Sequence, residues 1–422
     1  MRDRKLLSSF LRENAVTVMF VLLCALCLAL SGLAPSHVMF ELFGRLSRNA
    51  FLVLALIIPI VAGMGINFAI TIGAMAAQIS LLWVLEWRIP GTLGFVVAAL
   101  MTVPIAGFFG FLIGKLLNKM KGQEMIGSMI LGYFANGLYQ LLFLFIFGNL
   151  IPLSNPSLVI KGSVGVANTM DLSLEGGLKY ALDGLWRLPF KQALYVFMAV
   201  IAVYCVVRFA LSSERDVKRL AVCLAFPVAA CLLIQIPALQ ALFVTVNVPM
   251  ATFGLVALLC LFNVVIMRTR LGQQFRAVGQ SGAVANASGI NVNRVRIIAI
   301  MISTVLAGWG QLIFVQNMGS LQTYGAHEQV GLYAGAAILV GGASIVRATN
   351  AQALLGCILF HLLFIVAPDA GKNVFGNAAI GEYFRVFISY GVIAVALVMH
   401  AWSAVSKRKD PEAQMRAASE KA

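Results

Sequence analysis

Long apolar runs follow one another along almost the whole chain and are separated by short polar segments. A helix needs about 20 mostly apolar residues to cross a bilayer, and about twelve runs approach or exceed that length. With 61% hydrophobic and 11% charged residues, the chain is far more apolar than a soluble domain. The sequence therefore predicts an all-α polytopic membrane protein of about ten to twelve transmembrane helices, in a single domain over residues 1–422.

The edges of the apolar runs define the predicted spans. They are Ala15 to Leu33, Ala50 to Ile66, Ala69 to Glu86, Thr92 to Lys115, Glu124 to Gly148, Phe190 to Arg208, Leu220 to Leu242, Val248 to Met267, Val295 to Gln316, Val330 to Val346, Ala351 to Ala367 and Tyr383 to Ser403.

Basic residues are unevenly divided between the two sides of this map. One set of connecting segments, which includes both termini, holds 22 of the 31 Lys and Arg residues. Because basic loops stay in the cytoplasm, this set is predicted to be cytoplasmic, with the N-terminus at 1–14, a loop at 268–296 and a tail at 404–422. The insertion at 149–191 is then external. There we expect irregular structure with short interfacial helices, and either a plain connection or a docking surface for an external protein.

The segment from Arg268 to Arg296 is a long internal run without an apolar span, and it carries five arginines. Ser281 is a good helix N-cap, small residues follow it, and Gly289 suits the left-handed position that ends a helix. A helix of about two turns is marginal on its own. We therefore expect this helix to be held at both ends by the membrane domain and to be gripped by a partner.

The run GMGINFAITIGAMAAQ, from Gly63 to Gln78, joins two apolar runs with almost no loop between them. Its glycines and Asn67 indicate a broken or re-entrant helix, which a membrane protein tolerates only beside protein or a water-filled cavity. Such a break is a candidate part of a translocation path.

Neutral polar side chains, rather than charged ones, lie inside the predicted spans. They suit a path for an uncharged, hydroxylated solute, although each taken alone is more often a hydrogen bond between helices. The candidate path residues are Asn67, Thr71, Gln78, Asn136 and Gln140.

Several other functions are disfavoured. The four histidines lack the spacing of a metalloenzyme and no phosphate-binding loop is present, so we expect neither catalytic residues nor a metal site. The basic residues are scattered over short segments, which argues against nucleic-acid binding. The acidic residues lie mostly at span ends, which weakens the case for an ion-coupled carrier without excluding it.

The run RTRLGQQFRAVGQSGAVANASGINVNR, from Arg268, resembles the hallmark loop of the type II, binding-protein-dependent bacterial ABC importer permeases of the ribose, nucleoside and branched-chain amino acid group. The TxLG, RAVG and SGI elements occur at the family spacing. The resemblance implies that the loop is the contact with an ATPase. The residues it assigns to coupling, together with the Ser281 cap, are Gly272, Arg276, Ala277, Gly279, Ser281, Ala283, Ala285 and Gly289.

Three further runs are similar to this family more weakly. GMGINFAITIGAM has Asn67 where the family often has an acidic residue, GQEMIGSMILGY from Gly122 resembles a run of the nucleoside-type members, and VGLYAGAAILVGG from Val330 resembles the span after the hallmark loop. The region from about Lys191 to Leu242 adds spans beyond the usual family number.

The resemblance implies a permease subunit that is not itself an enzyme. ATP and Mg²⁺ would be bound by separate ABC ATPase subunits, and the chain itself would hold no cofactor. The other implied partners are a second permease subunit, identical or different, and an extracytoplasmic substrate-binding protein, at the bacterial inner membrane. A nucleoside or simple sugar is the favoured solute; branched-chain amino acids or a flavin-like vitamin are alternatives.

Overall fold

The computed structural model describes residues 15–120, 122–160, 165–174, 177–211, 217–377 and 379–387, with positions 390, 391, 394 and 398. The predicted N-terminus at 1–14, the tail at 404–422 and much of the span predicted from Tyr383 to Ser403 lie outside the described residues.

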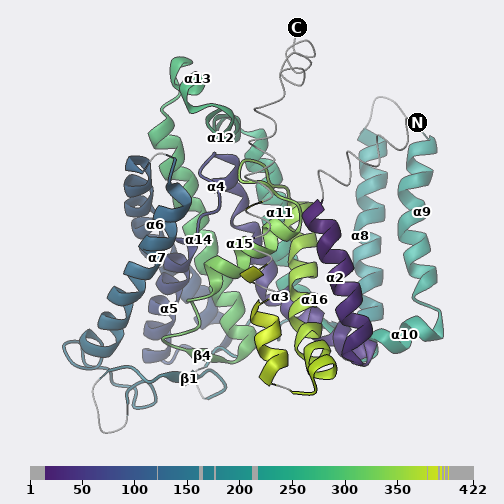
Figure 1. The fold of residues 1–422 in the computed structure, drawn as a ribbon, viewed down its shortest axis with the longest axis horizontal. Helices are drawn as coiled ribbons and strands as arrows, with labels where there is room; N and C mark the ends of the chain where they lie inside the picture. Colours follow the sequence, from purple (N-terminus) through teal and green to yellow (C-terminus); the bar gives the residue numbers. More distant parts are fainter. Residues whose placement is uncertain are drawn as a thin grey trace.

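Helices account for nearly all of the regular structure (Figure 1). They are α2 (Ala15–Ser31), α3 (Pro35–Leu54), α4 (Ile57–Val61), α5 (Ile70–Glu86), α6 (Gly91–Lys119), α7 (Glu124–Leu141) with a π-helical end η1 (Leu142–Ile146), α8 (Phe190–Leu211), α9 (Val217–Leu233), α10 (Pro237–Phe243), α11 (Met250–Arg268), α12 (Arg270–Gln280), α13 (Gly282–Ala287), α14 (Val292–Met318), α15 (Val330–Val340) and α16 (Asn350–Phe375).

The predicted fold class is confirmed. Among the described residues, six helices are long and apolar enough to cross a membrane: α3 with α4, α6, α7 with η1, α11, α14 and α16. Helices α9 and α10 form a further pair that bends by 86°. Four shorter apolar helices lie in α2, α5, α8 and α15. The chain is thus an all-α polytopic membrane protein.

The second span begins earlier than predicted. The predicted span began at Ala50 and left the charged residues before it in a connecting segment, but the structure forms one span over Pro35–Val61. Val38 and Leu42, one helical turn apart, are buried, whereas Glu41 is half-buried and pairs with Arg45. The charges therefore occupy one side of a helix whose other side packs in the core.

Two other predicted spans end differently. The span predicted from Leu220 to Leu242 is bent between Leu233 and Pro237, since proline begins the new helix α10. The span predicted from Val330 to Val346 is helical only to Val340. Glycines follow it, and Gly342 has a positive φ of 86° that ends the helix.

Helix α14 is the central element of the bundle, packed on α5 and α6 through very close backbone contacts. A Cβ atom at Gly73 of α5 would lie 2.2 Å from the Thr304 carbonyl oxygen of α14. A Cβ at Gly356 of α16 would lie 1.8 Å from the Ala337 carbonyl oxygen of α15. Only glycine permits such approaches, which membrane helices use because lipid gives them no hydrophobic drive to associate.

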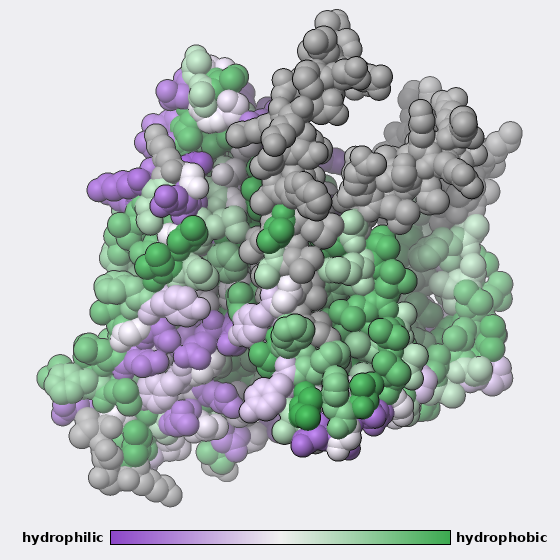
Figure 2. All heavy atoms as spheres, in the orientation of Figure 1, coloured by the Kyte–Doolittle hydropathy of each residue, from purple (hydrophilic) through white to green (hydrophobic). Residues whose placement is uncertain are grey.

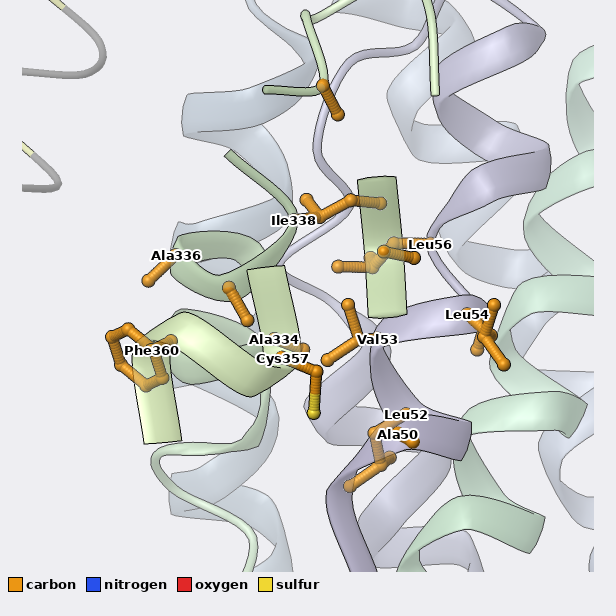
Figure 3. Close-up of a cluster of buried hydrophobic side chains, with 14 of the residues drawn as sticks. Ala50, Leu52, Val53, Leu54, Leu56, Ala334, Ala336, Ile338, Cys357 and Phe360 are labelled. Atoms are coloured by element: carbon orange, nitrogen blue, oxygen red, sulfur yellow. The ribbon is translucent and has the colours of Figure 1, made fainter. Parts of the chain in front are cut away.

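The α3, α15 and α16 helices share a second part of the core. In Figure 3, Leu52 and Val53 from α3 lie beside Ala334 from α15 and Cys357 from α16. Each of these four side chains is at most 4% exposed. This packing fixes the position of the C-terminal end of α3 relative to α15 and α16.

The insertion at 149–191 contains short strands. β1 (Thr169–Asp171) pairs antiparallel with β4 (Ser320–Gln322), and β2 (Arg187–Pro189) pairs with β3 (Asn247–Pro249). The described part of the insertion, which omits 161–164 and 175–176, has no helix before α8, so the expectation of short interfacial helices was wrong there. The strands satisfy backbone groups by pairing with the segments after α14 and before α11.

Helices α8 and α9 form a hairpin at the side of the bundle (Figure 1). Apart from each other, α8 contacts α10, β2 and β3, and the stacked rings of Phe190 and Phe243 lie 4.0 Å apart. This hairpin corresponds to the region in which the sequence suggested extra spans.

Helix α13 and the β1–β4 pair lie at opposite ends of the bundle (Figure 1). Which of these ends faces the cytoplasm stays a prediction from the charge count.

Candidate functional site

The segment from Arg268 to Arg296 forms a two-helix arm. Thr269 caps α12 by accepting from the Gly272 N–H at 3.3 Å, and Ser281 caps α13 by accepting from the Val284 N–H at 3.3 Å. Gly289 has a φ of 79°. The Ser281 cap, the short small-residue helix and the left-handed glycine are therefore present as the sequence predicts.

Helix α12 was not predicted. It buries Phe275 and Val278 one turn apart, while Arg276 between them is exposed. The signals were present in the sequence: an N-cap threonine and apolar residues at helical spacing. These signals did not lead to a helix prediction because many polar residues surround them.

Most of α13 faces solvent at the tip of the arm, as Figure 1 shows at its upper left. Ala283 is exposed, Val284 is 65% exposed, and only Ala285 is buried. Arg276 has a local role, because its Nη2 donates to the Met267 carbonyl oxygen at the end of α11. Its side chain thus holds α12 against α11.

The end of α12 contacts the start of a non-helical break that follows α4. A Cβ at Gly279 would lie 2.1 Å from the Val61 carbonyl oxygen, and one at Gly63 would lie 2.7 Å from the Gly279 Cα. Gly63 also has a φ of 74°. The two backbones therefore touch at a point where neither chain has room for a side chain.

The chain is non-helical from Ala62 to Ala69, between α4 and α5. The predicted break in the Gly63–Gln78 run is therefore present. Other elements satisfy its backbone: Ser128 Oγ of α7 accepts from the Phe68 N–H at 3.0 Å. The Arg296 guanidinium of α14 lies 3.5 Å from the Gly63 carbonyl oxygen. Irregular backbone inside a membrane protein requires such partners.

Arg296 also pairs with Glu124 at the start of α7, with Nη1 and Oε1 2.9 Å apart. The two side chains are only 14% and 10% exposed. One guanidinium thus connects the base of the arm, the break and α7. Three segments that are far apart in the sequence are therefore held together by one arginine side chain.

A hollow of about 730 Å³ lies beside α13. Its wall combines glycine and alanine with polar and aliphatic side chains, including Gly122 from the α6–α7 turn, Ala283 and Asn286 from α13, and Asn291 before α14. Glu124 and Arg296 also contribute to its wall. Of the predicted coupling residues, Ala283 and Gly289 line this hollow and Gly279 contacts the break. Gly272 and Arg276 lie instead against the end of α11.

A buried hydrogen-bonded network lies deeper in the bundle. Tyr139 Oη lies 2.6 Å from Gln78 Oε1 and 3.0 Å from the Thr323 carbonyl oxygen. The His327 ring lies 3.0 Å from Gln78 Oε1 and 2.8 Å from Asn136 Oδ1. Asn136 Nδ2 donates in turn to the exposed Glu328 carboxylate at 3.2 Å. The network runs from a buried glutamine to the surface.

His327, in the segment between β4 and α15, is neutral near neutral pH, because burial lowers the pKa of its imidazole to about 4. A neutral ring has one N–H, and donating it to Asn136 leaves Nδ1 as an acceptor. The Gln78 amide satisfies that acceptor when its nitrogen faces the ring. The segment from β4 to α15 appears in Figure 2 within a hydrophilic patch on an otherwise largely hydrophobic face.

The structure brings together only some of the predicted path residues. Gln78 and Asn136 belong to the network, and Asn67 lies in the break. Thr71 donates to the Phe68 carbonyl oxygen at 3.1 Å, a local bond. Gln140 is half-buried on α7. Sequence reasoning missed Tyr139 and His327, since nothing in their local pattern places them beside Gln78.

Asn67 is 1% exposed, and its two amide atoms have different environments. Its Oδ1 accepts from the Ala69 N–H at 3.1 Å. Among the described residues, no group accepts a hydrogen bond from its Nδ2. A buried donor without a partner is costly, so this side chain is suited to meet a solute or to change partners when the break moves.

Comparison with known proteins agrees with the resemblance of the arm to a loop of the ABC importer permeases. The model of the family described as the permease component of the branched-chain amino acid transport system matches residues 38–397. The chain belongs to this permease family. Its membership, and the six helices among the described residues that are long and apolar enough to cross a membrane, support a multi-pass protein of the bacterial inner membrane.

Curated relatives of this permease are similar over part of their length. The ribose import permease protein of Escherichia coli (strain K12) is 29% identical over 157 residues, 36% of this chain and 45% of that protein. A nucleoside ABC transporter permease protein of Lactococcus lactis subsp. cremoris (strain MG1363) is 27% identical over 180 residues, 42% of this chain and 54% of that protein. The chain spans about half the length of these relatives. No solved structure matches it.

Asn67 gives a first test of the path within the permease. With Asn67→Cys, we expect a polar thiol reagent to label the new cysteine in at least one nucleotide state of the assembled transporter, because Asn67 lies in the non-helical break and its Nδ2 has no acceptor among the described residues. The measurement is labelling of membranes before and after nucleotide addition, with the parent chain as background. Ser303→Cys, at a fully buried α14 position, is the control that should stay unlabelled. Absence of labelling at position 67 in every state would remove Asn67 from the path.

Proposed function

We propose that this permease is the membrane-spanning subunit of an ATP-driven ABC importer, and that it moves a small polar solute into the cell. Separate ATPase subunits bind ATP and Mg²⁺, a second permease subunit completes the pathway, and an external binding protein delivers the solute. A nucleoside or a simple sugar is the favoured solute class. The names of the ribose and nucleoside relatives support this choice.

The observation that carries the proposal is the contact between the arm and the broken span. A partner that grips exposed α13 moves α12, and Gly279 of α12 touches the backbone at Val61 and Gly63. Because no side chain separates the two backbones, displacement of the arm acts directly on the break. Asn67 lies within the break, and α7 carries Tyr139 of the network that also contains Gln78 and His327.

The hollow beside α13 supports a protein partner. The glycine and alanine residues in its wall let an ATPase surface approach the backbone closely, and its asparagines offer that surface hydrogen-bonding groups. Val284, exposed at the tip, gives such a partner an apolar contact.

Other solutes fit the same machinery. The family description names branched-chain amino acids, so a carrier for these or for a flavin-like vitamin is the alternative within the importer class. An ion-coupled secondary carrier is less well supported, since α12 and α13 would then have no partner to act on.

The energy source distinguishes these classes. The permease is co-purified with the ATPase subunits and binding protein that the proposal requires, and reconstituted into vesicles. We expect solute uptake that requires ATP and Mg²⁺ and persists when ion gradients are collapsed. Measurement of radiolabelled ribose and uridine uptake, with a Walker-lysine variant of the ATPase as control, checks this. Uptake driven by an ion gradient without ATP would contradict the proposal.

A further inference from the structure

A second cavity lies at the end of the bundle opposite α13, between α3, the end of α14, the start of α15 and α16. Its volume is about 620 Å³, within the usual range for a small-molecule site. Its wall includes the segment from Gln322 to Gln329. The network around His327 contains residues of the same segment, so the cavity and the candidate path are adjacent.

The cavity has a basic wall. Arg45 and Arg48, on one face of α3, line it together with Arg385. Arg45 has a carboxylate partner in Glu41 at 3.8 Å, and Arg385 has one in Glu382 at 2.6 Å. Two of the three positive charges are therefore compensated locally.

Arg48 differs from the other two. Its Nη1 contacts the Met318 sulfur at 2.7 Å, a weak acceptor. Within the part of the chain that the structure describes, no carboxylate lies within ion-pair distance of Arg48; Glu41 and Asp183 act on it only from further away. A half-buried guanidinium without a paired anion is costly in a membrane protein and marks a functional site.

His361 of α16 adds a second, independent observation. It lines the same cavity and is 5% exposed. Its Nδ1 has no hydrogen-bond partner among the described residues. His361 thus brings to the cavity wall a buried ring nitrogen that gains a hydrogen bond if a ligand displaces the side chains covering it.

The rest of the wall suits an organic molecule. Tyr333 and Phe364 pack edge to face with ring centroids 5.1 Å apart, which gives an apolar surface. Asn49, Gln322 and Gln329 supply neutral hydrogen-bonding groups. Arginine binds carboxylate and phosphate through paired N–H donors.

We propose that this cavity binds the anionic group, a carboxylate or a phosphate, of the transported solute, with Arg48 as the main anchor. The inference rests on the proposed import of a small polar solute. It departs from the favoured class in one respect, since it assigns an acid or phosphate ester of sugar or nucleoside size in place of a neutral sugar or nucleoside. A phospholipid headgroup carries the same chemistry, and the experiment separates the two sources.

The test uses the full chain with Asn49→Cys in nanodiscs of phosphatidylcholine, with labelling of the parent chain as background. The probes are D-glucuronate, glucose 6-phosphate and, as the neutral match, D-glucose. We expect the two anions, but not glucose, to slow labelling of position 49. The unpaired charge should also make an anionic methanethiosulfonate react faster than a cationic one, by about tenfold.

Arg48→Gln should abolish both the protection by anions and the preference for the anionic reagent. Arg48→Lys keeps the charge and should keep the reagent preference with weaker protection. Arg347→Gln removes an exposed charge that does not line the cavity and should change neither. Size-exclusion profiles show that each variant is folded.

Equal protection by glucose, or protection that survives in Arg48→Gln, would overturn the inference. Slowing seen only in phosphatidylglycerol nanodiscs would assign the cavity to lipid and also overturn it. The assay needs no ATPase. If uptake is ATP-driven but no anion protects position 49, only this inference fails; if anions protect but uptake needs no ATP, the proposed function fails instead.

Discussion

With Gly279→Leu, solute uptake should fall by about tenfold to a hundredfold while the ATPase still hydrolyses ATP. A Cβ at this position would lie 2.1 Å from the Val61 carbonyl oxygen, so α12 has to move away from the break. Overpacking of this kind costs about 1–3 kcal/mol, and each 1.4 kcal/mol is about a factor of ten. The measurement is uptake and phosphate release by the same reconstituted vesicles.

Gly254→Leu, at an exposed position of α11, is the control with the same substitution. A Cβ there has no heavy atom within 4 Å, so both uptake and hydrolysis should be unchanged. Normal uptake by Gly279→Leu would show that the contact with the break does not transmit motion. Loss of both activities, together with loss of the ATPase from the purified complex, would indicate a docking defect instead.

The short helix of the arm was predictable because its signals are local. A capping serine, a run of small residues and a glycine with positive φ act within one or two turns of chain. Neighbours elsewhere in the fold did not change them. The same holds for the break at Gly63, where glycines and a polar residue interrupt an apolar run.

The second span shows where prediction from the local sequence fails. The prediction left Glu41, Arg45 and Arg48 in a connecting segment, and charges inside a span are costly. The fold instead places them on one side of α3, where Glu41 pairs with Arg45 and Arg48 lines the cavity. Their compatibility with a helix depends on α14, α15 and α16, which hydropathy along the chain does not place beside them.

The polar network required contacts over long sequence separations. Gln78 and Asn136 could be selected from sequence because polar side chains inside apolar spans are uncommon. Their link through His327 connects residues 249 and 191 positions apart. From the sequence alone, His327 is one of four histidines that share no recognisable spacing.

Removal of one partner of the Arg296–Glu124 pair should destabilise the protein strongly. In Arg296→Ala, the Glu124 carboxylate, whose side chain is 10% exposed, loses the guanidinium at 2.9 Å. Breaking a buried pair in this way costs about 3–5 kcal/mol, much of it from the charge left behind. We expect a clear fall in the thermal unfolding midpoint of the protein in detergent, together with loss of uptake, because the Gly63 carbonyl also loses its contact with Arg296.

The double variant Glu124→Gln with Arg296→Met separates charge from anchoring. It leaves no unpaired charge and keeps most of the side-chain volume, so the unfolding midpoint should return towards that of the parent protein. Uptake should not return, since the double variant has no donor for the Gly63 carbonyl oxygen and the break is no longer tied to α14. Recovery of both would mean that the pair serves stability alone, and recovery of neither would mean that packing, rather than charge, holds α7 against the arm.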